Sequence, residues 1–391
     1  MKILKKLALI PLACILIFAV AGCKKTGYGV YTNIPQGGYT LTDKTFKLKG
    51  QIEGYTAAEN QPEAAEGVTY TTRGKLYYEM AAEAELVVAA DFSTETAINH
   101  YNDFTSAVAA KLDEIGKVLS PTVTNSDIYN FNNAAAGATV EISKITYDVL
   151  QLALDIFKWT GGCYNPALYY NVEAYGFGNN HKYPQSSAEL PDDETILKYT
   201  KLAEHFGEII LSKDEGYFVT KPTATVDVNG ENLSMKLDLG GIGKGCAVDC
   251  IDKLFDDYGY KFGYFNFGAS SMLVKNHDKN GSYNISFINP RSISRGTYLT
   301  TSISNEKLST SGDYEQYYIL DGTRYCHIID PATGKPVQTG IMTVTVIGGQ
   351  KEYTAAENDA LTTALMCMGK DRAIKFIEEQ LTDRRVAFTC L

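Results

Sequence analysis

The chain has 391 residues, of which 45% are hydrophobic and 21% charged, and its formal net charge is −10. This is the composition of an ordinary globular protein with ample length for a hydrophobic core. Because contact with nucleic acid needs a basic surface, a chain this acidic is a poor nucleic-acid binder.

The N-terminus is typical of a secretory signal, which we expect to span residues 1–22. Three lysines precede an apolar run over residues 7–21, which is too short and too early for an ordinary membrane-spanning segment. Small residues stand directly before Cys23, as in a bacterial lipobox. We predict that Cys23 is lipidated and anchors the protein to the extracytoplasmic face of the cell membrane. The alternative is an uncleaved anchor helix.

The next segment, residues 23–67, is rich in small and polar residues without sustained periodicity and is predicted to be a tether. One globular domain is expected over residues 68–391. Its first strand is expected at residues 75–91. Helical spacing predicts a helix that starts at residue 94 and runs to residue 112. A second amphipathic helix is predicted over residues 141–159, with Ser143 as its N-cap.

Beyond residue 208, short strands alternate with one helix before two helices near the C-terminus. The expected strands lie at residues 208–211, 217–220, 225–228, 263–267, 271–275, 283–288, 299–302, 317–320, 342–347 and 386–389. The expected helices lie at residues 248–258, 354–368 and 370–380. This order predicts an α+β fold with mixed or antiparallel sheets and flanking helices.

The most informative stretch is LDLGGIGKGCAVDCID, residues 237–252. It is predicted to be an apolar strand, a glycine-rich turn and the start of a helix. Glycine has no Cβ, so Gly240, Gly241 and Gly243 can adopt positive φ and present bare backbone groups beside a helix N-terminus. This arrangement favours a phosphate or metal–phosphate ligand, although such turns also occur for packing reasons.

Four further motifs accompany this stretch. They are TGGCYNPALYYNVEAYGFG (160–178), LSTSGDYEQYY (308–318), YCHIIDPATGKP (325–336) and ENDALTTALMCMG (357–369). The series resembles the FAD:protein FMN transferase (ApbE) family of flavin-trafficking lipoproteins. The resemblance implies an enzyme that takes FAD as a substrate with Mg²⁺ or Mn²⁺, releases AMP, and attaches FMN by a phosphoester bond to a Thr or Ser. The acceptor implied is a membrane redox subunit or a secreted flavoprotein.

Asp359 and Thr363 stand four residues apart on a predicted helix, so their oxygens project from one face about one turn apart. Hard cations such as Mg²⁺ take oxygen ligands and usually retain waters and substrate phosphates. The resemblance implies that these two side chains, with the backbone carbonyl of Gly241, hold the metal beside the FAD pyrophosphate. Alone, the pair would be a first-turn helix charge and a core residue.

His327 stands between a predicted strand and a proline turn. A histidine can act as a general base near neutral pH, so His327 is the candidate catalytic residue that activates or orients the acceptor hydroxyl. The alternative is a histidine that braces the turn by a hydrogen bond to Asp330.

The resemblance also implies a set of substrate-binding residues. They are Met80, Cys163, Tyr164, Asn165, Asp238, Lys244, Ser311 and Ile329. Two sites depart from the family pattern. Ala81 and Ala82 follow Met80 where the family usually has Gly-Thr, and Ala269 and Ser270 stand in its Gly-Gly-Asn turn. Asp238 could instead cap the next helix, and Ser311 is expected in a turn.

The six cysteines after Cys23 lack the paired spacing of a zinc site. Cys163, Cys246 and Cys326 lie inside the motifs and are predicted to be buried small hydrophobic residues near the pocket. Two other functions stay open. One is an FAD pyrophosphatase that gives FMN and AMP with water as the acceptor. The other is a lipid-anchored flavin-binding protein without turnover.

Overall fold

The structure is a computed structural model that describes residues 29–32, 71–178, 182–276, 283–291, 297–349 and 355–390. The predicted signal, the lipidation site Cys23 and most of the predicted tether lie outside these ranges. Within them, no helix has both the length and the apolar character needed to cross a membrane.

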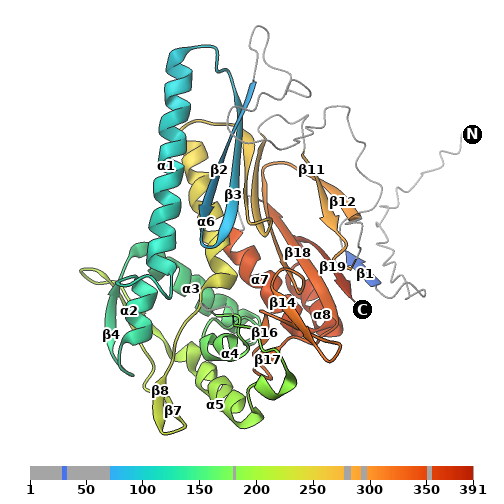
Figure 1. Ribbon diagram of the computed structural model, residues 1–391. Coiled ribbons are helices and arrows are strands. Elements are labelled where there is room, and N and C mark those ends of the chain that lie inside the picture. The colour runs from blue at the N-terminus through green and yellow to red at the C-terminus, as the bar shows by residue number, and fades with distance from the viewer. Residues whose placement is uncertain are drawn as a thin grey trace, which may run out of the picture.

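An antiparallel sheet forms the centre of the domain (Figure 1). In the described chain its eight strands run in the order β1-β19-β18-β13-β10-β9-β3-β2, and every pairing is antiparallel. The strands are β1 Gly29–Thr32, β2 Thr71–Glu79, β3 Ala82–Ala90, β9 Phe262–Phe267, β10 Ser271–Asn276, β13 Glu306–Gly312, β18 Ile341–Gly349 and β19 Arg385–Cys390. Strand β1 comes from the predicted tether, so part of that segment belongs to the sheet.

Helices cover one face of this sheet (Figure 1). They are α1 Glu95–Leu119, α6 Gly240–Asp257 and α7 Ala355–Met368. Helix α7 packs on β13 and β18, α6 packs on α7, β9 and β10, and α1 packs on α6. Because α7 is apolar on nearly all sides, it is buried between α6 and the sheet.

The remaining elements surround this core. The helices are α2 Asp127–Asn133, α3 Lys144–Trp159, α4 Tyr169–Ala174, α5 Asp193–Glu204, α8 Lys370–Gln380 and two short 3₁₀ turns, Ser187–Glu189 and His205–Glu208. The small sheets pair β4 Thr139–Ile142 and β5 Ile210–Ser212 with β6 Tyr217–Thr220, β7 Thr225–Val228 with β8 Glu231–Ser234, and β11 Tyr283–Ile288 with β12 Thr297–Ile303. Two more pair β14 Tyr317–Leu320 with β15 Thr323–Cys326, and β16 Ile329–Asp330 with β17 Lys335–Pro336.

The predicted α+β class is confirmed, and the amphipathic helix α3 begins after Ser143, whose hydroxyl accepts the Thr146 N–H at 3.2 Å. All six cysteines of the described chain are free thiols, and only Cys250 is more than slightly exposed. The prediction of one strand over residues 75–91 is wrong. A tight turn at Met80 and Ala81 splits that segment into the hairpin β2–β3.

Two hairpin turns lie side by side at one end of the sheet. Met80 and Ala81 have φ of 49° and 57°, and the β9–β10 turn places Gly268 and Ala269 at 63° and 52°. The turns are tied together, since the Gly268 N–H donates to the Glu83 carbonyl at 2.8 Å. Alanine therefore holds a glycine-type backbone conformation at both departures from the family pattern. Such backbone strain in non-glycine residues concentrates at functional sites.

We predict that Ala81→Gly stabilises the protein. Left-handed backbone costs a non-glycine residue about 1–2 kcal/mol, and the extra freedom of an unfolded glycine returns about 0.5–1, so the net gain is about 0.5–1 kcal/mol. Denaturant unfolding of the variant measures it. Ala82→Gly, at the first residue of β3, is the matched control and should lose stability. A loss at both positions would contradict the strain argument.

Candidate active site

A cavity of about 560 Å³ opens where the N-terminal end of α6 meets α7 and the β2–β3 turn. Every residue that the sequence analysis named as catalytic, substrate-binding or metal-binding lines it. They are Met80, Cys163, Tyr164, Asn165, Asp238, Gly241, Lys244, Ser311, His327, Ile329, Asp359 and Thr363. Residues that lie far apart in the sequence, from Met80 to Thr363, therefore line the same cavity.

The glycine-rich stretch differs from the prediction. Helix α6 begins at Gly240, eight residues earlier than expected, and none of Gly240, Gly241 and Gly243 has positive φ. These glycines leave the surface of the helix bare. A Cβ on Gly243 would meet only the flexible end of the Met80 side chain, at 2.7 Å, and one on Gly241 would be in ordinary contact with Tyr164 and the Thr363 hydroxyl, both at 3.4 Å. The N-terminal end of the helix therefore opens directly on the cavity, with its partial positive charge.

Asp359 lies one helical turn into α7 and is 2% exposed. Its Oδ2 accepts the Gly245 N–H at 3.0 Å. In a regular helix that N–H donates to the carbonyl four residues earlier, here Gly241, so at most a shared hydrogen bond remains for this carbonyl. Burial raises the pKa of Asp359, and the nearby Lys244 opposes that shift. The protein thus holds a costly buried carboxylate beside a backbone oxygen.

Thr363 lies one turn after Asp359 and contacts Ser311. The Ser311 hydroxyl lies 2.8 Å from the Thr362 hydroxyl and 3.4 Å from that of Thr363. Ser311 was expected in a turn, but it belongs to strand β13, where it pairs with Val344. The central sheet therefore fixes its hydroxyl against α7.

His327 is half-buried, and its backbone N–H and ring Nδ1 both face the Gln316 carbonyl, at 3.1 and 3.4 Å. Burial and then the charge of Lys244 lower the pKa of His327 to about 4, so the ring is neutral at pH 7. Within the described chain, the Asp330 carboxylate accepts from Ala332 and Thr333 of its own turn and not from His327. The turn is thus braced without the histidine ring.

Lys244 is the cation around which the acids of the cavity are arranged. Burial raises the pKa of Asp238 and Glu315, and in both cases Lys244 opposes the shift. Asp238 also accepts the N–H of Gly240, the first residue of α6, at 2.8 Å, although the N-cap position itself is Leu239. Glu315 and its neighbour Gln316 line the cavity but were not singled out from the sequence. They lie inside a quoted motif, where no spacing marks them.

The segment from Cys163 to Asn165 forms another wall. Burial raises the pKa of Cys163, which favours the unreactive thiol. The Tyr164 hydroxyl is buried and has no hydrogen-bond partner among the residues described. The Asn165 amide donates to the Ala203 carbonyl and accepts the Ala167 N–H, both at 2.9 Å. Asn165 therefore shapes the wall, while Tyr164 leaves a polar group for a ligand to satisfy.

A neighbouring cavity of about 780 Å³ adjoins the first. Strand β11 and the sheet surface that β11 and β12 cover form much of its wall. The two cavities share Met80, Ala81, Lys244, Thr310, Glu315 and Gln316. Lys244 can therefore be approached from two sides.

Comparisons with known proteins agree with this architecture. The model of the ApbE family matches residues 80–388. The FAD:protein FMN transferase of Buchnera aphidicola subsp. Schizaphis graminum is 28% identical over 266 residues, covering 68% of this chain and 73% of the relative. That of Treponema pallidum (strain Nichols) is 28% identical over 270 residues, covering 67% and 70%.

Solved structures share the fold. The crystal structure of the ApbE protein from Thermotoga maritima has a TM-score of 0.66 at 24% identity, covering 81% of this chain and 93% of that one. The apo form of the flavinyl transferase ApbE from Pseudomonas stutzeri has a TM-score of 0.65 at 20% identity, covering 83% and 92%.

We predict that Asp359→Asn melts at a higher temperature than the wild type in the absence of divalent cations. The folded-state pKa of Asp359 is raised, so its contribution to stability is complete below about pH 3.9 and is lost as the pH rises through the folded-state value. The advantage of the variant should therefore grow with pH, as melting curves at several pH values would measure.

The control is Asp252→Asn, which removes a buried carboxylate paired with Lys275 and Lys307 and should lower the melting temperature. Asp359→Asn should also abolish divalent-cation binding. A variant that melts lower than the wild type at every pH would contradict the account of Asp359.

Proposed function

The chain belongs to the ApbE family, and we propose that it transfers the FMN part of FAD to a Thr or Ser hydroxyl of a partner protein, with a divalent cation. The observation that carries the proposal is the meeting of Asp359, Thr363, Gly241, Lys244 and His327 in one cavity. It combines oxygen ligands, a fixed cation and a neutral imidazole. These are the groups that phosphoryl transfer requires.

The reaction exchanges one bond to phosphorus for another. The acceptor hydroxyl oxygen bonds to the phosphorus of the FMN phosphate, and the bond from that phosphorus to the bridging oxygen breaks. AMP leaves with the bridging oxygen and its electron pair. The ring of His327 takes the proton of the acceptor hydroxyl. It can do so because its lowered pKa leaves the ring unprotonated at pH 7.

The residues present suit a hard cation that is held partly by the substrate. Among the described residues no group of three or more His, Cys, Asp or Glu could hold a metal. One carboxylate with a hydroxyl and a carbonyl is typical of Mg²⁺ sites, which are completed by water and substrate phosphates. We therefore assign Mg²⁺, or Mn²⁺, to Asp359, Thr363 and the Gly241 carbonyl. When bound, the cation neutralises charge on the pyrophosphate.

The chain's own residues also contribute positive charge around the substrate phosphates. Lys244 adds a fixed positive charge, and the N-terminal end of α6 adds the helix dipole. The second cavity shares Lys244 with the first, so it offers room beside this cation for an acceptor larger than water.

The test is incubation of the purified protein with FAD, Mg²⁺ and a candidate acceptor bearing a Thr or Ser. We expect the acceptor to gain the mass of FMN less water, with one AMP released for each FMN attached. AMP and free FMN without acceptor modification would support a pyrophosphatase instead. FAD binding with neither product would support a flavin-binding protein without turnover.

We predict that His327→Asn leaves FAD affinity near normal and slows FMN attachment roughly 10²–10⁴-fold, the usual contribution of a general base. Because the folded-state pKa of His327 is about 4, its neutral form persists well below pH 6.5. The ratio of wild-type to variant rates should therefore stay constant from pH 8 to about 5.5 and fall only toward pH 4. A ratio that drops near pH 6.5 would refute the assigned protonation state.

We propose that Cys23 carries a lipid and that the protein is held on the extracytoplasmic face of the cell membrane, close to membrane redox subunits or secreted flavoproteins. The support is the lipobox-like sequence before Cys23. Cys23→Ala should move the protein from the membrane fraction to the soluble fraction, or block its processing. Full retention of the variant in membranes would refute the lipid anchor.

A further inference from the structure

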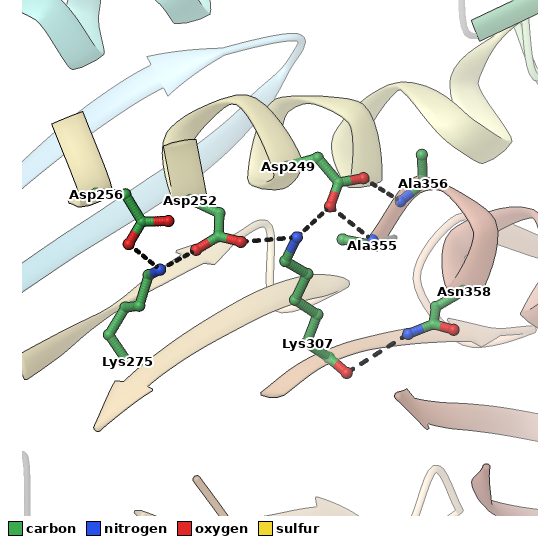
Figure 2. Close-up of polar contacts among 8 residues, drawn as sticks. All are labelled: Asp249, Asp252, Asp256, Lys275, Lys307, Ala355, Ala356 and Asn358. Atoms are coloured by element: carbon green, nitrogen blue, oxygen red, sulfur yellow. Dashed lines mark hydrogen bonds and ion pairs between the residues drawn. The ribbon is translucent and has the colours of Figure 1, made fainter. Parts of the chain in front are cut away.

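Alternating carboxylates and buried lysines connect α6 to the sheet (Figure 2). Lys275 of β10 lies 2.5 Å from Asp252 and 2.7 Å from Asp256, both on α6. Lys307 of β13 lies 2.6 Å from Asp249 and 2.8 Å from Asp252. The two lysines are 1% and 5% exposed. Each buried cation is thus paired with two carboxylates, as burial of a charge requires.

The last carboxylate of this series also contacts α7. The Asp249 Oδ1 accepts the Ala355 N–H at 2.9 Å, and its Oδ2 accepts the Ala356 N–H at 3.0 Å. Ala355 and Ala356 are the first two residues of α7, whose N–H groups have no acceptor within the helix. Asp249 therefore caps α7 from a different helix and places a negative charge at its positive end.

This cap lies one turn from the candidate cation site. Gly245, one turn before Asp249 on α6, donates to Asp359, one turn after Ala355 on α7. A Cβ on Gly245 would lie 2.4 Å from the Ala355 carbonyl oxygen, so the two backbones are in direct contact. The helices are joined at two successive turns. A shift of the first turn of α7 would therefore move Asp359 relative to Gly241.

We propose that Asp249 is a positioning residue, which caps α7 and thereby holds Asp359 in place to bind the divalent cation together with Gly241 and Thr363. The inference rests on the proposed function, since it takes these three residues as the cation ligands. Ion pairing alone does not explain Asp249, because Lys307 keeps a second partner in Asp252. Only Asp249 of the three α6 carboxylates accepts backbone N–H groups of α7 in the described contacts.

Three variants separate the cap from the ion pair. Asp249→Asn keeps the shape but sets an NH₂ group against one of the two α7 N–H donors. Asp256→Asn makes the same change at the other end of the charge series, on a side chain that is 62% exposed. Lys307→Met removes the ion pair and leaves both cap bonds in place.

Mn²⁺ binding is measured from the EPR signal of free Mn²⁺, with saturating FAD and no acceptor. Hydrogen exchange of the first turn of α7 is followed in parallel. Asp249→Asn should weaken Mn²⁺ binding roughly tenfold, which is the low end of the range for residues that orient metal ligands. The Mn²⁺ affinity of both control variants should stay within about twofold of the wild type. The first-turn amides of α7 should exchange faster in Asp249→Asn alone.

Faster exchange in Asp249→Asn with Mn²⁺ affinity within twofold of the wild type would make the cap merely structural and overturn the proposal. An equal loss of affinity in Lys307→Met would assign the effect to the ion pair and also overturn it. A wild-type protein that binds no Mn²⁺ would refute the cation site itself, and the positioning role with it. If Asp249→Asn is insoluble, the double variant Asp249→Asn with Lys307→Met is compared with Lys307→Met alone. Because the double variant removes both charges of the Asp249–Lys307 pair, neither is left without its partner.

Discussion

The rest of the site depends on the backbone contact between α6 and α7 at Gly245. No side chain fits there, because its Cβ would meet the Ala355 carbonyl oxygen at 2.4 Å. The contact brings the N-terminal end of α6, with Gly241 and Lys244, against the first turns of α7, with Asp359. The sheet supports the arrangement from behind, since α7 packs on β13 and β18. Two segments more than one hundred residues apart in sequence thus form one polar surface.

The interior contains two kinds of buried charge. Asp249 and Asp252 are both paired with lysines, and Asp249 also accepts two backbone N–H groups, so their desolvation is compensated within the protein. Asp359 accepts one backbone N–H but has no cation at salt-bridge distance in the described chain, and burial raises its pKa. The desolvation of a carboxylate without a paired cation is therefore found in the cavity, at Asp359. A cation bound there would supply the positive charge that Asp359 lacks. Unpaired buried charges of this kind are expected at functional sites.

Local signals predicted the elements that depend on local physics. The apolar stripe of α3 and its Ser143 cap depend only on neighbouring residues in the sequence, so this helix was predictable. The start of α6 was not, because glycines have poor helix propensity and the backbone contact of Gly245 with α7 is tertiary. The Met80–Ala81 turn lacks the usual turn residues. The motifs identified the cavity residues, but the cap at Asp249 joins residues 106 positions apart and leaves no local pattern.

The pairing of β1 with β19 would have a geometric consequence if Cys23 carries the proposed lipid. Only five residues separate Cys23 from Gly29, so a lipid on Cys23 would sit within roughly 20 Å of that edge of the sheet. The β2–β3 hairpin, whose turn lines the cavity, forms the opposite edge. Ser311, which contacts Thr363, lies on the fourth strand from that edge, so at about 4.8 Å per strand the proposed cation site would lie roughly 15 Å across the sheet from the β1 edge, and the hairpin side of the cavity roughly 30 Å. An acceptor resident in the same bilayer would then need a modification site on a stalk or loop of comparable reach.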